Sequence, residues 1–191
     1  MKVRVLGIGN VLMSDDGFGP FVVRTLDAAY QCPPDVELVD VGTPGLDLTP
    51  FLLDTESVIF VDTVTSRGAP GEIRVYDRED ILRHPPQPRT GGHDPAMKEG
   101  LLTVAAAGAG PSHVTLVGVI PAWIATGVAL SPQVQGAVGR AIAPILSTLE
   151  SLGVTLIPRT DRLAPDIWWI PAGEVPRYRT VPQREADLVV R

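Results

Sequence analysis

The sequence contains very little cysteine and very little lysine. Cys32 is the only cysteine among 191 residues, so no internal disulfide and no cysteine-rich zinc site can form. Lys2 and Lys98 are the only lysines, and the formal net charge is −6. Nucleic-acid binding depends on clustered Lys and Arg that neutralise phosphates, so we expect no nucleic-acid partner. The N-terminus lacks the layout of a secretory signal, and we expect a cytoplasmic protein.

Common catalytic and nucleotide-binding motifs are also missing. The sequence has no Gly-x-Ser-x-Gly elbow and no phosphate loop ending in Gly-Lys-Ser/Thr. Gly7-x-Gly9 could begin a dinucleotide-binding fingerprint, but Leu12 stands where the third glycine belongs. The acidic residues that follow would repel a pyrophosphate. A tight turn, in which Asn10 bonds to the local backbone, is the favoured interpretation, and a nucleotide-binding module is a disfavoured alternative.

One uncharged stretch, residues 114–139, is long enough in principle to cross a bilayer. Glycine and proline interrupt it repeatedly, and Ser131 and two glutamines lie near its end. We interpret this stretch as a strand, a loop and the start of a helix, and we expect no membrane insertion.

Apolar runs alternate with helical patterns along the chain. Such alternation favours an α/β fold, a single domain in which helices flank a three-layer, mostly parallel twisted sheet. Ser131-Pro132 and Asp94-Pro95 each read as a helix cap followed by proline at the first helical position. We predict strands at 3–8, 36–41, 57–62, 71–76 and 114–120, helices at 18–29, 46–53, from 95 onward and 132–152, and a loop at 79–93.

Residues 154–191 form a proline-rich C-terminal extension in which the periodic pattern dissolves. We treat residues 1–153 as the α/β domain and the extension as a separate segment. For the pair Trp168-Trp169 two roles are open, docking a partner or covering the core. Burial habits of tryptophan favour the second.

Three side chains are predicted to meet at one edge of the sheet. In open parallel sheets, ligands gather beyond the carboxyl ends of the strands. Asp16 follows the first strand, Asp62 ends the third, and His93 follows the glycine-rich loop. Two oxygens and one nitrogen suit a borderline divalent metal such as nickel or zinc, with positions left open for catalysis or metal sensing. For Asp15 and Asp16 a structural role is the alternative, because acids at a helix N-terminus interact favourably with its dipole.

A series of motifs runs through the chain. The main one is the N-terminal Gly7-Ile8-Gly9-Asn10-x-Leu12-x-x-Asp15-Asp16-Gly17-x-Gly19. The series continues at Phe60-Val61-Asp62, at Gly68-x-Pro70-Gly71, at His93, at Val114-x-Leu116-Val117-Gly118-Val119-x-Pro121 and at Gly127-x-x-Leu130-Ser131-Pro132. In these motifs the chain resembles the hydrogenase maturation proteases, and the resemblance covers residues 1 to 153.

The resemblance implies a nickel-dependent, aspartic-type endopeptidase that trims the C-terminus of a [NiFe]-hydrogenase large-subunit precursor. It implies that Asp16, Asp62 and His93 contact the metal and carry the catalysis. The nickel would arrive with the substrate and serve recognition, and other divalent metals can occupy the same site. We expect a monomer. The alternative is an assembly factor that checks the metal of the same precursor without cleaving it.

Overall fold

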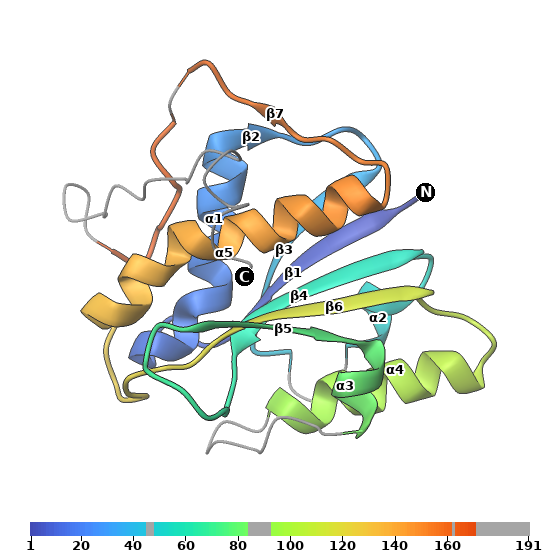
Figure 1. The fold of residues 1–191 in the computed structure, drawn as a ribbon, viewed down its shortest axis with the longest axis horizontal. Coiled ribbons are helices and arrows are strands. Elements are labelled where there is room, and N and C mark those ends of the chain that lie inside the picture. The colour runs from blue at the N-terminus through green and yellow to red at the C-terminus, as the bar shows by residue number, and fades with distance from the viewer. Residues whose placement is uncertain (45–47, 84–92, 162, 171–191) are drawn as a thin grey trace.

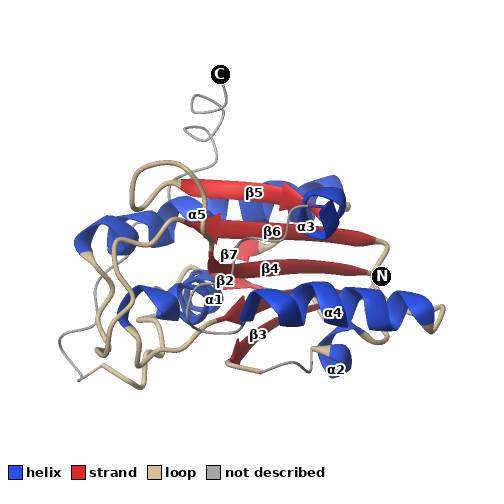
Figure 2. Ribbon diagram, turned by 90° about the horizontal axis from the view of Figure 1, so that it is seen from below, coloured by secondary structure: helices blue, strands red, loops and turns tan. Residues whose placement is uncertain are grey.

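The structure is a computed structural model that describes residues 1–44, 48–83, 93–161 and 163–170. Within helix α4 the side chains of residues 93–96 are also outside the description. A central five-stranded sheet has the order β3-β1-β4-β6-β5, with helices on both faces (Figures 1 and 2). The predicted fold class, a mostly parallel α/β sheet in a single domain, is confirmed.

Four strands of the sheet are parallel, and the fifth, at one edge, is antiparallel. The parallel strands are β3 (Val36–Gly42), β1 (Val3–Ile8), β4 (Ser57–Thr63) and β6 (His113–Val119), and the antiparallel one is β5 (Ile73–Asp77). One face of the sheet is covered by the helices α1 (Phe18–Ala29) and α5 (Pro132–Ser151), and the 3-10 turn η1 (Ser14–Gly17) directly precedes α1. The other face is covered by α2 (Thr49–Leu52), α3 (Arg78–Arg83) and α4 (His93–Ala106).

The central strands are mostly apolar because both of their faces are covered. In β4, Ile59 and Val61 join the core cluster beneath α1 and α5, whereas Val58 and Phe60 join the cluster beneath α2 and α4. Side chains of a strand alternate between the two faces of its sheet, so a doubly covered strand reads as an unbroken apolar run. This packing is the reason for the apolar pattern that predicted a central strand at 57–62.

The glycines of the N-terminal motif allow close packing of α1 on the sheet. A Cβ on Gly19 would lie 2.3 Å from the carbonyl oxygens of both Ile8 and Val61. A Cβ on Gly7 would lie 2.6 Å from the carbonyl oxygen of Gly19. These distances are far below van der Waals contact, so side chains here would push α1 away from β1 and β4. The glycines thereby fix the position of η1, which immediately precedes α1.

The boundaries of three helices differ from the predictions. Residues 79–83, predicted as loop, belong to α3, where the Asp80 N–H donates to the Asp77 carboxylate at 2.8 Å and Glu79 pairs with Arg83. Asp77 thus caps a short helix that the nearby prolines obscured in the sequence. Helix α4 begins at His93 rather than Pro95, and α2 covers only Thr49–Leu52. Residues 45–47 and 84–92, which include parts of the predicted helix and loop, lie outside the described residues.

Helix α5 has the predicted cap. The Ser131 hydroxyl accepts a hydrogen bond from the Val134 N–H at 3.4 Å, and Pro132 occupies the first helical position. Pro144 lies inside this helix. No helix in the described part of the chain is both long and apolar enough to span a membrane.

Part of the C-terminal extension packs on the α1 face of the domain. Strand β7 (Ile157–Pro158) pairs antiparallel with β2 (Tyr30–Gln31). The Trp169 ring meets Phe21 of α1 edge-to-face, with ring centroids 5.1 Å apart, whereas Trp168 is largely exposed. The prediction that the tryptophan pair covers the core is therefore confirmed for Trp169. Two further residues beyond position 153, Leu156 and Ile167, join the same core cluster.

Candidate active site

The candidate site lies at the edge of the sheet where β1, β4 and β6 end. Asp62 is the penultimate residue of β4, pairs in register with Gly118 of β6, and is only 3% exposed. Asp16 lies in η1, on the connection between β1 and α1, and is 7% exposed. Both acids therefore belong to segments that end or turn at one sheet edge, as the sequence predicted.

A contact between Asp16 and Thr63 joins the two acid-bearing segments. The Thr63 hydroxyl donates to Oδ1 of Asp16 at 3.5 Å, and Thr63 directly follows Asp62 in β4. Oδ2 of Asp16 accepts a hydrogen bond from the Asn10 N–H at 2.9 Å. The Thr63 N–H in turn donates to Oδ1 of Asp62 at 2.6 Å. Thr63 thus donates to both carboxylates, through its hydroxyl to Asp16 and through its N–H to Asp62.

The turn that carries Asp16 has the predicted local structure. The Asn10 side-chain oxygen accepts a hydrogen bond from the Leu12 N–H at 3.0 Å, which is the local backbone contact expected for this asparagine. Gly9 has φ 136°, and a Cβ there would lie 1.7 Å from the carbonyl oxygen of Asp16. Only glycine fits this position, so the second glycine of the motif serves the approach of η1 to β1.

His93 is the first residue of α4, and its side chain lies outside the described part of the structure. Over the side chains that are described, no group of three His, Cys, Asp or Glu residues could hold a metal ion. The structure therefore places Asp16 against Thr63, the residue that follows Asp62 in β4. The joint metal site of Asp16, Asp62 and His93 stays a prediction.

Asp15, the neighbour of Asp16, has a different environment. Its carboxylate is fully buried and accepts hydrogen bonds from the backbone N–H groups of Ala122 at 2.8 Å, Trp123 at 3.1 Å and Ser131 at 2.6 Å, and from the Ser131 hydroxyl at 2.9 Å. These four donors compensate the desolvation of the charge. Asp15 therefore fastens the connection between β6 and α5 to η1.

Sequence patterns alone do not separate the roles of Asp15 and Asp16. Both acids precede a helix, and the helix dipole accounts for either of them equally well. In a 3-10 turn successive side chains point about 120° apart, so adjacent acids face different surroundings. Sequence reasoning missed two features of the site. Asp15 holds the β6–α5 connection against η1, and Thr63 donates hydrogen bonds to both Asp16 and Asp62. One sequence signal could have suggested the role of Asp15. It is the acidic pair on a turn, together with the Ser-Pro helix cap much later in the chain.

Among the described residues, the Asp16 carboxylate has few hydrogen-bond donors around it. Asp16 accepts two hydrogen bonds from described residues, and a carboxylate can accept about four. None of the ion pairs between described residues includes Asp15 or Asp16. A buried carboxylate with spare lone pairs favours a cation or a proton donor as its further partner. Hard and borderline divalent metals fit this donor set.

Cys32 does not belong to this site. It lies beyond the C-terminal end of α1, partly buried against the core cluster beneath α5. Burial raises the pKa of its thiol, and the negative charge of Asp27 raises it further, against a smaller opposing effect of Arg159. A raised pKa disfavours the thiolate, which is the nucleophilic form of cysteine.

Comparisons with known proteins point to one protein family. The sequence profile of the hydrogenase maturation proteases matches residues 20–148. The chain is 31% identical over 160 residues to the hydrogenase 2 maturation protease of Escherichia coli strain K12, covering 83% of this chain and 97% of that protein. It is 34% identical over 168 residues to the hydrogenase expression/formation protein HupM of Azotobacter chroococcum, covering 86% of this chain and 80% of that protein.

Solved structures show the same fold. The hydrogenase maturating endopeptidase HybD from E. coli superposes with a TM-score of 0.79 at 31% identity, over 84% of this chain and 99% of that one. A hydrogenase 2 maturation peptidase from a Thaumarchaeota archaeon superposes with a TM-score of 0.60 at 36% identity, over 80% and 99% of the two chains. The matched profile, the two relatives and the shared fold together establish that this chain belongs to the hydrogenase maturation protease family.

Proposed function

We propose that this protein is an endopeptidase that removes a C-terminal peptide from the nickel-loaded precursor of a [NiFe]-hydrogenase large subunit. In this proposal Asp16, Asp62 and His93 contact the substrate's nickel and act as the catalytic residues. The observation that supports it most directly is the contact of buried Asp16 in η1 with Thr63, the residue that follows buried Asp62 at the end of β4.

The physical argument rests on incomplete ligation. Two carboxylates and one imidazole are too few ligands to satisfy a borderline divalent metal, so open positions remain for groups of the substrate. A precursor that carries nickel would complete the coordination, and an unloaded precursor would lack this contribution to binding. Once bound, a divalent metal can polarise a carbonyl or lower the pKa of a bound water, and either effect promotes hydrolysis of a peptide bond.

The proteins that resemble this chain support the substrate class. HybD from E. coli is named a hydrogenase maturating endopeptidase, and its fold matches over nearly its whole length. Asp62 is held at the end of β4, and Asp16 lies on the turn that precedes α1; catalytic groups on regular elements are positioned more precisely than groups on loops. We also propose that the protein is located in the cytoplasm and acts as a monomer.

The experiment that tests the function is the intact mass of the hydrogenase large subunit from the protein's own host, with and without this gene. We expect a subunit heavier by a C-terminal peptide when the gene is absent. Complementation with the wild type should restore the mature mass, whereas His93→Ala and Asp62→Asn should not. Asp161→Asn, which changes an exposed acid in the C-terminal segment, is the matched control and should restore it fully.

A purified reaction separates cleavage from assembly. The wild-type protein should shorten the nickel-loaded precursor and leave the nickel-free precursor intact. If the purified protein binds the loaded precursor without changing its mass, the non-cleaving assembly factor becomes the better description. If loaded and unloaded precursors are cut equally well, recognition through the substrate's nickel is wrong.

A further inference from the structure

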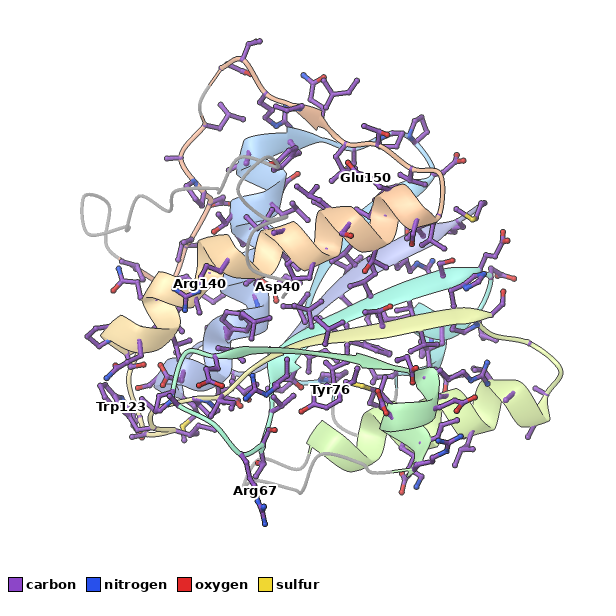
Figure 3. The ribbon with its side chains drawn as sticks, viewed as in Figure 1. Asp40, Arg67, Tyr76, Trp123, Arg140 and Glu150 are labelled. Carbon is purple, nitrogen blue, oxygen red and sulfur yellow. The ribbon has the colours of Figure 1, made fainter. Side chains whose placement is uncertain are left out.

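Two large apolar side chains are exposed on the loops that surround the acid-bearing turn. Leu12, on the connection between β1 and η1, is 56% exposed, and Trp123, on the connection between β6 and α5, is 48% exposed. Figure 3 shows Trp123 on that connection, beyond the end of β6. Side chains of this size lose favourable burial when they stay in water, so a pair of them on neighbouring loops calls for an explanation.

The backbones of the two loops are hydrogen-bonded to each other. The Ser14 N–H donates to the Gly127 carbonyl at 2.7 Å, and the Gly127 N–H donates to the Leu12 carbonyl at 2.9 Å. The buried Asp15 carboxylate binds the Trp123 N–H from the same side. Exposure of Leu12 and Trp123 is thus imposed by loops whose backbones are hydrogen-bonded to each other. It does not result from a poorly held segment.

Both loops are anchored in the core and carry no charge. Val11 and Val128 pack against the core cluster beneath α5 and hold the bases of the two loops. Residues 9–14 and 120–132 contain no charged side chain, although the protein as a whole has a net charge of −6. This uncharged surface, with Leu12 and Trp123 as its large exposed side chains, is called the rim below.

The rim adjoins the candidate active site. Val119 pairs in register with Thr63, and Val64 N–H donates to the Val119 carbonyl at 2.8 Å, so the β6–α5 connection leaves the sheet next to Asp62. On the other side, Leu12 precedes Asp16 by four residues within the same turn. A polypeptide with one group held between Asp16 and Asp62 would have its flanking residues within reach of the rim.

We propose that Leu12 and Trp123 are a docking surface for an extended segment of the protein substrate, next to the bond that is cleaved. The occupant is the part of the large-subunit precursor that flanks its metal site, and it presents apolar side chains to the rim. This inference rests on the proposed function. Continuity of the rim with the site selects this occupant over a second copy of the chain, because a copy seated there would cover Asp16 and Asp62.

The test compares cleavage kinetics of full-length variants on the purified nickel-loaded precursor. Leu12→Ser and Trp123→Ser should each raise KM about tenfold or more, as expected for the loss of an apolar anchor. Their kcat should stay within about threefold of the wild type, because interactions made equally in the ground and transition states affect KM alone. Leu102→Ser, which changes a similarly exposed side chain on α4, is the control and should leave both parameters unchanged.

A binding measurement keeps this proposal separate from the proposed function. The Kd of the loaded precursor should rise about tenfold for both rim variants, whether or not the wild type cleaves it. Wild-type KM and Kd in both rim variants would overturn the docking surface. A wild-type dimer that Trp123→Ser dissociates in sedimentation experiments would also overturn it and assign the rim to self-association. Failure of the wild type to cleave would contradict the proposed function alone.

Discussion

Asp15 and Asp16 are adjacent in the chain, but they serve two different regions of the molecule. Asp15 is turned toward the β6–α5 connection and is satisfied by four donors. Asp16 is turned toward β4 and accepts hydrogen bonds from Asn10 and Thr63 among the described residues. Both carboxylates are buried, so burial does not distinguish the structural acid from the candidate ligand. The number and type of donors around each oxygen make the distinction.

The largest expected effect is on activity at the Asp16 and Asp62 region. Asp62→Asn and Asp16→Asn should each lower kcat/KM for precursor cleavage by about a hundredfold or more, because an amide is neither an anionic metal contact nor a proton acceptor. The melting temperature should shift by no more than about 4 °C, since asparagine preserves size and most contacts. Cleavage assays and calorimetry on the same preparations measure both. Near-wild-type cleavage by either variant would contradict its assigned role.

The next effect is on stability at the Asp15 region. Asp15→Ala should lower the free energy of unfolding by about 3 kcal/mol or more, because it leaves three backbone N–H groups and a hydroxyl without their acceptor. Asp16→Ala removes the acceptor of fewer donors and should have a clearly smaller effect, about 1 kcal/mol. Urea unfolding of both variants measures the difference. Equal loss of stability would remove the contrast between the two acids.

A smaller effect on the free energy of unfolding is expected at Gly19, one of the motif glycines that let α1 pack closely on the sheet. Gly19→Ala should destabilise the protein by about 1–3 kcal/mol, because the new Cβ would overlap two backbone carbonyl oxygens of the sheet. Gly136→Ala, on the exposed side of α5, is the matched control, since its Cβ would meet nothing closer than 3.9 Å. It should stabilise the protein by about 0.5–1 kcal/mol. Thermal unfolding of the two variants shows whether close packing of α1 is the reason for Gly19.

The smallest effect is expected at Cys32, which lies away from both acidic regions. Its pKa is raised by burial, so the thiol stays protonated at neutral pH and is a poor nucleophile. Cys32→Ser should therefore cleave the precursor at a rate within about twofold of the wild type. A loss of cleavage in a variant that remains folded by circular dichroism would return a thiol mechanism to consideration.

The sequence predicted the parts of the fold that depend on local patterns. Predominantly apolar runs located β1, β4 and β6, because these strands are buried on both faces. Ser131-Pro132 located the start of α5, because the cap and the proline act within one helical turn. Helix α3 was missed because its cap, Asp77, lies at the end of a strand and its short length leaves no periodic pattern.

The candidate site was predicted in part. Placing Asp16 and Asp62 at one sheet edge required only the rule that parallel strands end together. The sequence predicted that the tryptophan pair covers the core, because tryptophan is usually buried. It did not indicate that Trp169, which contacts Phe21, is the buried ring and Trp168 the exposed one. The metal-contacting role of His93 stays a prediction.

By itself, the sequence determined the alternation of strands and helices, the glycine-rich turn and the presence of acids where parallel strands end. These features follow from interactions between residues close together in the chain. Tertiary structure alone decided that Asp15 fastens a loop while Asp16 approaches β4, since Asp15 and Ala122 are separated by 107 positions. It also decided that Leu12 and Trp123 share one rim. Such contacts depend on the order of the strands in the sheet, and no local pattern encodes that order.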